Sequence, residues 1–148
     1  DFIERQIKGI EPFEKTYEQK TELMEKVLEQ RKEPFQFLEK KDTEKLKYFI
    51  GADILKTSSE WSFKKEMFPE IFIELTYDEN QKELDVSYSG KNLEKIGSYH
   101  IELIAIFLIN HILRFITINN PEKDLPDICY IMFSRMMTKE KNWKHRRI

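Results

Sequence analysis

The first 32 residues carry a narrow apolar stripe of helical spacing, with a polar gap at Thr21. Steps of three and four between apolar side chains predict a helix in two pieces over 2–32. The second piece begins near Pro12, because proline suits the first turn of a helix. The stripe either packs against its own domain or meets a partner helix, since its narrowness and its Glu and Lys flanks are typical of a coiled-coil seam. Its members are Ile3, Ile7, Ile10, Phe13, Tyr17, Met24 and Leu28.

The apolar pattern changes from a helical to a strand period between residues 42 and 89. Asp42 is a candidate cap for a helix that extends to about Leu55, with Leu46, Phe49, Ile50 and Ile54 on its inner side. The runs EIFIELTY and KELDVSYSG then alternate apolar and polar residues on either side of a short polar turn. This alternation predicts an antiparallel β-hairpin at about 70–89. The segment WSF at 61–63 is a candidate for a third strand.

Residues 98–118, SYHIELIAIFLINHILRFITI, form the most apolar stretch of the chain. They predict a buried helix that ends at Asn119-Asn120-Pro121. The longest uncharged run is shorter than the roughly 20 residues that a membrane span needs, so we expect no transmembrane segment. A last apolar helix should follow from about Asp124.

These elements predict a single α+β domain over 1–148 that is rich in helix. We expect a long amino-terminal helix within a helical arm at 1–32, a central antiparallel β-hairpin, two apolar carboxyl-terminal helices and a basic tail at 139–148. Runs of helices around a hairpin, without regular alternation, favour this class over a parallel α/β fold.

Charge and cysteine content narrow the possible partners and compartment. The chain has 25 Lys and Arg against 27 Asp and Glu, a net charge of −2, so no global field steers it toward nucleic acid or a membrane. Its single cysteine, Cys129, excludes an internal disulfide framework and a multi-cysteine zinc site. The amino-terminal residues DFIERQIKGI do not resemble a signal peptide. We therefore expect a cytoplasmic protein.

Two of the three histidines, His100 and His111, fall within the apolar stretch. They share one helix face but lie about 16 Å apart along the axis. Zinc–nitrogen bonds of about 2.0–2.1 Å cannot bring both to one metal ion. With Phe107 and Arg114 they could line a small-ligand site, in which Arg114 would meet an anionic group. The alternatives are the solvent edge of a half-buried helix and a set of hydrogen-bonded core histidines.

No sequence pattern of a known catalytic or phosphate-binding loop occurs in the chain: GxGxxG, GxxxxGK[ST], HExxH and CxxC are all missing. Glu74 and Asp85 are residue types that hold divalent metals. They fall on the polar phase of the predicted hairpin, however, where exposure to solvent explains them. Cys129 lies among apolar residues, as a core thiol does. We therefore expect neither enzymatic activity nor a cofactor or metal site.

The last ten residues gather basic side chains around a tryptophan. Cations beside an aromatic ring can hold phosphates and stack a base, which makes nucleic-acid binding one hypothesis. Contact with an anionic membrane surface and simple complementation of a helix dipole are the alternatives. The residues concerned are Lys139, Lys141, Trp143, Lys144, Arg146 and Arg147.

The sequence favours a small interaction or regulatory module that forms a homodimer through its long amphipathic helix. The predicted contact residues are Phe13, Tyr17, Met24 and Leu28. The alternatives are nucleic-acid binding by the basic tail and a small-ligand sensor with its site at His100, Phe107, His111 and Arg114.

Overall fold

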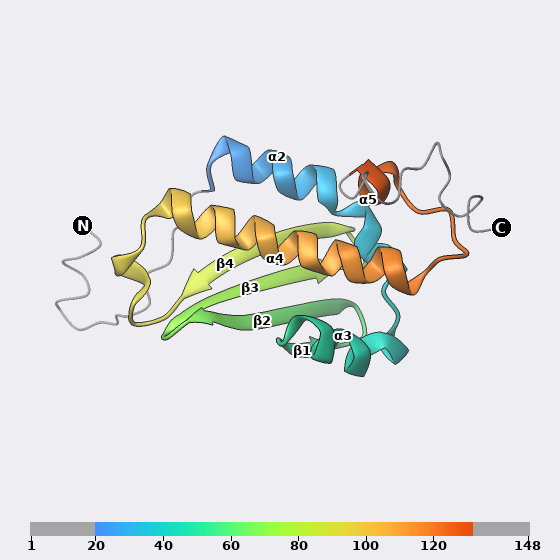
Figure 1. Ribbon diagram of the computed structural model, residues 1–148, viewed down its shortest axis with the longest axis horizontal. Helices are drawn as coiled ribbons and strands as arrows, with labels where there is room; N and C mark the ends of the chain where they lie inside the picture. Colours follow the sequence, from blue (N-terminus) through green and yellow to red (C-terminus); the bar gives the residue numbers. More distant parts are fainter. Residues whose placement is uncertain (1–19, 132–148) are drawn as a thin grey trace.

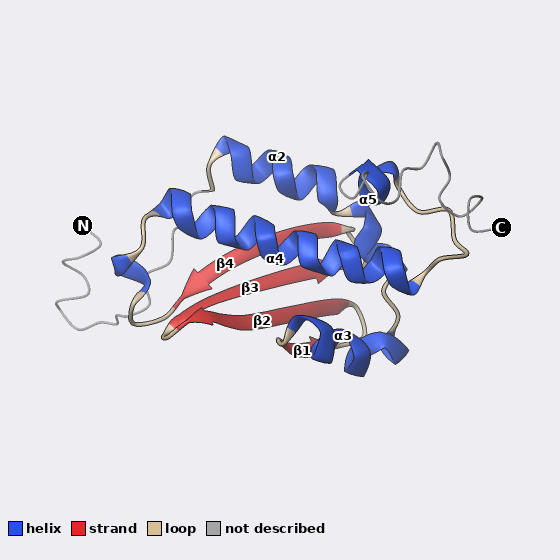
Figure 2. Cartoon of the chain, viewed as in Figure 1, coloured by secondary structure: helices blue, strands red, loops and turns tan. Residues whose placement is uncertain are grey.

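The structure is a computed structural model that describes residues 20–131. Within this range helices cover one face of a four-stranded antiparallel sheet (Figure 1). The covering helices are α2 (Glu22–Arg31), α3 (Thr43–Ile50) and α4 (Ser98–Asn119), and α5 (Asp127–Ile131) packs against α4. The layer of helices above a layer of strands confirms the predicted α+β class (Figure 2).

The sheet is a meander in which each strand pairs with its neighbour in the sequence. Its strands are β1 (Asp53–Lys56), β2 (Glu60–Phe68), β3 (Ile71–Asp78) and β4 (Glu83–Ser89), in the order β1-β2-β3-β4. The predicted hairpin is confirmed as β3 and β4. The candidate strand around WSF is the longest strand, β2, which pairs with both β1 and β3.

Alternation along the strands places one set of apolar side chains under the helices. Trp61 pairs with Tyr77, and Phe63 pairs with Leu75, which in turn pairs with Val86. All five are buried, and the rings of Trp61 and Phe63 are stacked with centroids 5.7 Å apart. The side chains on the opposite face of the sheet are mostly polar. The hydrophobic core therefore lies between the sheet and the helices.

Three short 3₁₀ helices join these elements. They span Glu33–Phe37, Lys40–Asp42 and Leu93–Lys95. The first contains the buried Pro34 and Phe35 and so contributes to the core.

The prediction of a helix from Asp42 to about Leu55 is wrong for the residues after Ile50. α3 ends at Ile50 because Gly51 adopts a left-handed conformation with φ of 65°. Residues 53–56 then form β1, in which Ile54 pairs with Phe63 of β2. Ile54 still faces inward, but it does so from a strand. The Asp42 side chain makes no capping bond to α3; it accepts from the backbone N–H of Glu39 at 3.0 Å.

The helix expected to continue through Thr21 begins only at Glu22. Thr21 has extended backbone angles and caps α2, because its hydroxyl oxygen accepts from the backbone N–H of Met24 at 3.1 Å. The polar gap in the apolar stripe thus marks a helix boundary. Residues 1–19 and the basic tail lie outside the described residues.

We predict that Gly90→Ala destabilises the fold much more than Gly97→Ala. Gly90 has a φ of 122°, and a Cβ there would lie 2.1 Å from the carbonyl oxygen of Glu70. At Gly97 a Cβ would meet only the His100 ring, at 3.5 Å. Urea denaturation should show a loss of about 2 kcal/mol or more in unfolding free energy for Gly90→Ala. Gly97→Ala, at a helix N-cap, should cost less than about 1 kcal/mol. Equal losses would contradict this account of Gly90.

Candidate functional site

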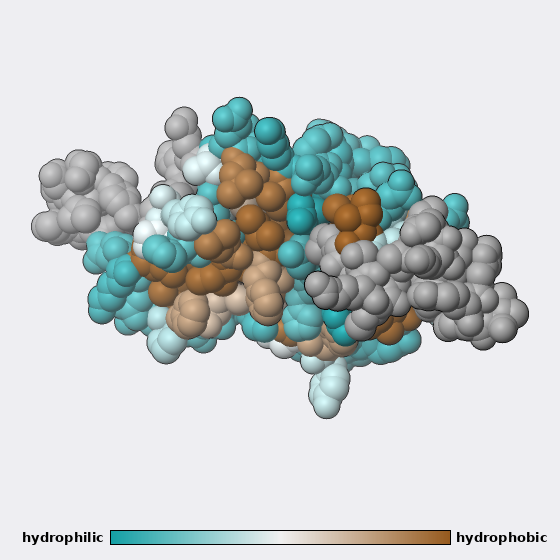
Figure 3. Space-filling model, turned by 45° about the horizontal axis from the view of Figure 1, so that its top comes forward, coloured by the Kyte–Doolittle hydropathy of each residue, from teal (hydrophilic) through white to brown (hydrophobic). Residues whose placement is uncertain are grey.

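The outward side of α4 carries large apolar residues that nothing in the described range covers. Tyr99, Leu103 and Phe107 lie on successive turns of the helix and are 60%, 42% and 66% exposed. Leu23 on the neighbouring helix α2 is 44% exposed. We call these four residues the α4 strip. Figure 3 shows apolar side chains gathered in one patch on the helical side of the molecule.

The α4 strip is exposed because the other three sides of α4 are occupied. Its inner side, with Ile101, Leu108 and Ile112, is buried. α2 lies along one flank, where the Thr21 hydroxyl donates to Glu102 at 2.7 Å. α3 lies along the other flank, where Phe49 packs against the His111 ring with centroids 4.8 Å apart. Of the four sides of α4, the residues that the structure describes leave open only the one pointing away from the sheet.

The part of the α4 strip that lies on α4 has no exposed acid, lysine or arginine among its residues. Between Tyr99 and Phe107 the one ionisable acid or base other than His100 is Glu102, which is buried. Both of its carboxylate oxygens accept from Thr21, one from the hydroxyl and the other from the backbone N–H at 3.3 Å. The glutamate therefore serves the packing of α2 on α4. The exposed surface of α4 from Tyr99 to Phe107 is therefore mainly apolar and carries no exposed Asp, Glu, Lys or Arg.

Such a surface suits contact with another apolar surface. Monomeric soluble proteins seldom leave large contiguous apolar patches open to water, and such patches usually mark interaction sites. Removing aromatic and aliphatic side chains from water is also the main favourable term in protein association.

The four residues of the ligand-site hypothesis all lie on one helix, α4. His100, Phe107 and Arg114 are exposed at the surface. His111 is half-buried between the rings of Phe49 and Phe107. Burial, together with the charges of Lys65 and Arg114, lowers the pKa of His111. This environment keeps the imidazole neutral at physiological pH.

Two of the four residues predicted for self-association lie in the core, and the other two lie outside the described residues. Met24 and Leu28 are buried in the core of their own domain, at 0% and 6% exposure. Met24 is therefore not available to a partner in this structure, whereas Leu28 lines a groove beside β4. Phe13 and Tyr17, together with Lys141, Trp143, Lys144, Arg146 and Arg147 of the basic tail, lie outside the described residues.

The groups considered for catalysis have structural partners. Glu74 accepts a hydrogen bond from the Ser62 hydroxyl at 2.6 Å, and Asp85 forms an ion pair with Lys20 at 2.9 Å. Burial raises the pKa of the Cys129 thiol to about 11, which keeps it protonated at neutral pH. Within residues 20–131, no group of three or more His, Cys, Asp or Glu side chains is placed to hold a metal ion.

By length and composition alone, α4 could cross a membrane. Of its most apolar window, however, 56% is buried inside the domain. Mostly buried core helices of soluble proteins meet the same criteria of length and composition.

No known family model, curated protein or solved structure matches this chain. The candidate site therefore depends on the geometry of the chain itself.

We predict that His111 makes the fold less stable as the pH falls below neutrality. Its pKa is lowered in the folded protein, so the unfolded chain, with a histidine pKa near 6.5, binds the proton first. Unfolding free energy should decline as the pH drops from about 7 through 6.5 and toward the lowered pKa. His111→Gln should flatten this decline in urea titrations at pH 7 and pH 5. His100→Gln, which removes an exposed histidine from the same helix, is the control. An unchanged pH dependence in His111→Gln would contradict the prediction.

Proposed function

We propose that this protein is a small cytoplasmic interaction module that forms a homodimer through the α4 strip. The observation that supports the proposal is the exposure of Tyr99, Leu103 and Phe107 on consecutive turns of a helix that also forms the centre of the core. The rigid domain holds these side chains in place, so little conformational freedom remains to be lost on association.

A second copy of the chain is a suitable occupant because the α4 strip is apolar and uncharged. In a twofold dimer the same patch lies on both sides of the interface, so a strongly charged patch would repel itself. Two α4 helices crossing near Leu103 and Phe107 would bring apolar side chains against apolar side chains. The exposed aromatic rings of Tyr99 and Phe107 are also of the kind that is enriched at interfaces.

The proposal keeps the predicted homodimer but moves its interface. The predicted contact surface is the stripe over residues 12–32, and Met24 and Leu28 of that stripe lie on the buried side of α2 instead. Phe13 and Tyr17 remain predicted contact residues. A cytoplasmic location is supported by the lone cysteine, Cys129, which is free and buried.

The double substitution Leu103→Glu with Phe107→Glu should convert the dimer into a monomer. It would place four carboxylates in the apolar centre of a twofold interface, where removing a side chain at a well-packed position already costs about 2 kcal/mol or more. We expect the dimer dissociation constant to rise about 100-fold or more. Light scattering coupled to size-exclusion chromatography, over a range of concentrations, measures this change.

Tyr48→Glu is the matched control, because Tyr48 is an aromatic residue of α3 that is 91% exposed and lies outside the α4 strip. This variant should remain a dimer, and thermal unfolding should show that both variants are folded. A wild-type protein that is monomeric at high micromolar concentration would overturn the proposal. A wild-type monomer that cosediments with neutral phosphatidylcholine vesicles would overturn it in favour of membrane contact.

A further inference from the structure

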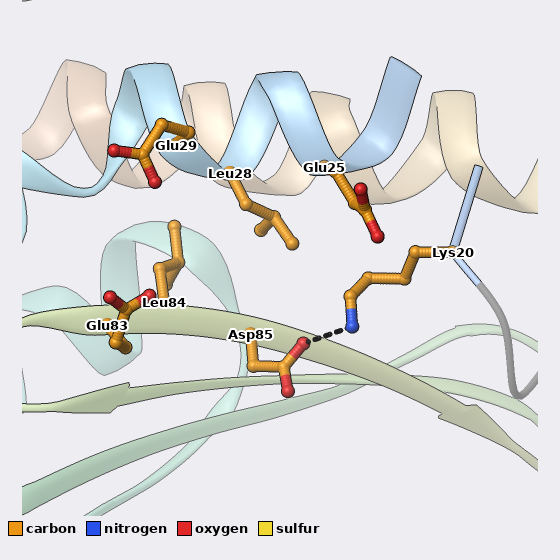
Figure 4. A pocket seen from close by; sticks show the side chains of 7 residues that line it. All are labelled: Lys20, Glu25, Leu28, Glu29, Glu83, Leu84 and Asp85. Carbon is orange, nitrogen blue, oxygen red and sulfur yellow. Dashed lines mark ion pairs between the residues drawn. The ribbon is translucent and has the colours of Figure 1, made fainter. Parts of the chain in front are cut away.

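A groove with a cavity volume of about 390 Å³ lies between helix α2 and strand β4. The side chains of Leu28 from α2 and Leu84 from β4 face each other across it (Figure 4). Lys20, Glu25, Glu29, Glu83 and Asp85 complete its lining. The groove therefore has an apolar centre and a charged rim.

Carboxylates outnumber cations around this groove. Lys20 pairs with Asp85 at 2.9 Å near one end of the groove, as Figure 4 shows. Lys32 pairs with both Glu29, at 3.1 Å, and Glu83, at 3.4 Å. For the fourth carboxylate, that of Glu25, the described range offers no cation within ion-pair distance. Four acids against two lysines leave a net negative rim.

The groove also runs along the edge of the sheet. Strand β4 is the last strand of the described meander and pairs on one side only, with β3. The backbone N–H of Val86 donates to the side chain of its own neighbour, Asp85, at 2.8 Å. Backbone groups alternate between the partner strand and the outside along an antiparallel edge. Leu84 and Val86 therefore direct their backbone groups outward, next to the groove.

We infer that this groove binds an extended, basic segment of a protein partner, which adds to β4 as a fifth strand. Backbone groups of the segment would pair with those of Leu84 and Val86, as in other cases of strand addition. The Val86 N–H, which donates to the Asp85 side chain in the free protein, would donate to a carbonyl of the segment instead. Alternate side chains of a strand point to opposite faces. Apolar side chains on one face would contact Leu28 and Leu84, and lysine or arginine side chains would reach the carboxylates of the rim, among them Glu25.

The occupant is defined by charge complementarity and by the shape of the groove. A basic helix would satisfy the carboxylates but could not pair with the strand edge. A neutral strand would pair with the edge but would leave the excess acids uncompensated, whereas opposite charges on two surfaces speed association and exclude wrong partners. This partner differs from the second copy proposed at the α4 strip, and the two inferences stand or fall independently.

The test uses the full chain and a fluorescein-labelled peptide of alternating lysine and valine, seven residues long, in a fluorescence anisotropy titration at low salt. The wild-type protein should bind it, and the affinity should fall as salt is added. Glu25→Lys should weaken binding about tenfold, because it reverses a charge on the rim. Glu44→Lys changes the same residue type in the first turn of α3, away from the groove, and should alter the affinity less than twofold.

Two further peptides separate strand addition from simple charge attraction. A peptide with N-methyl groups on alternate backbone amides keeps every lysine but cannot pair along one edge, and it should bind about tenfold more weakly. A peptide with glutamate in place of lysine should not bind. The inference is overturned if the lysine peptide fails to bind, if N-methylation has no effect, or if Glu44→Lys weakens binding as much as Glu25→Lys does.

Discussion

The fold depends on covering the apolar face of a sheet that is wider than one helix. Four strands spaced about 4.8 Å apart span roughly 14 Å between the outermost backbones, whereas a helix with its side chains is about 10–12 Å wide. α4 crosses the centre of the sheet, and α2 and α3 fill the flanks. The same geometry leaves α4 raised between its neighbours, so the side that points away from the sheet meets no other element of the described domain.

Polar contacts fix α2 on its flank in a single orientation. Glu102 near the start of α4 binds Thr21, and the Arg31 guanidinium at the other end of α2 donates to Asn110 at 2.9 Å. The two helices therefore run parallel, and neither end of α2 can slide. Breaking the first contact would leave a buried carboxylate without its hydrogen bonds, which is costly in a medium of low polarity. These two contacts hold the helix that forms one wall of the groove beside β4.

The sequence predicted those elements whose period is unambiguous. The β3–β4 hairpin and α4 were found because their alternation and their apolar length leave little choice. The sequence identified β2 only as a candidate strand, because Lys65 interrupts the alternating apolar positions that Trp61 and Phe63 begin. In the structure the ammonium group of Lys65 turns to the end of α3 and donates to the Ile50 carbonyl at 2.6 Å. A charge used in this way cannot be recognised from periodicity, because the carbonyl that it binds lies on another element.

The sites were harder to predict than the fold. A helix that is apolar almost all round does not show which side is buried. The sequence therefore placed Phe107 with the histidines in a candidate ligand site and did not identify Leu103 and Phe107 as an exposed apolar surface. The groove was missed because its walls come from segments near residues 25–29 and 83–85, which are distant in the sequence. Only the pairing of α2 with the end of the sheet brings them together.

The alkylation rate of Cys129 can report how often one end of the core opens. Cys129 is the only thiol of the chain and is fully buried, and its high pKa suppresses the reactive thiolate. An alkylating reagent can reach it only when α5 separates from α4. The rate at which the thiol is consumed under native conditions therefore measures how often this end of the core opens, and each ligand or association that stabilises the closed form will slow that rate.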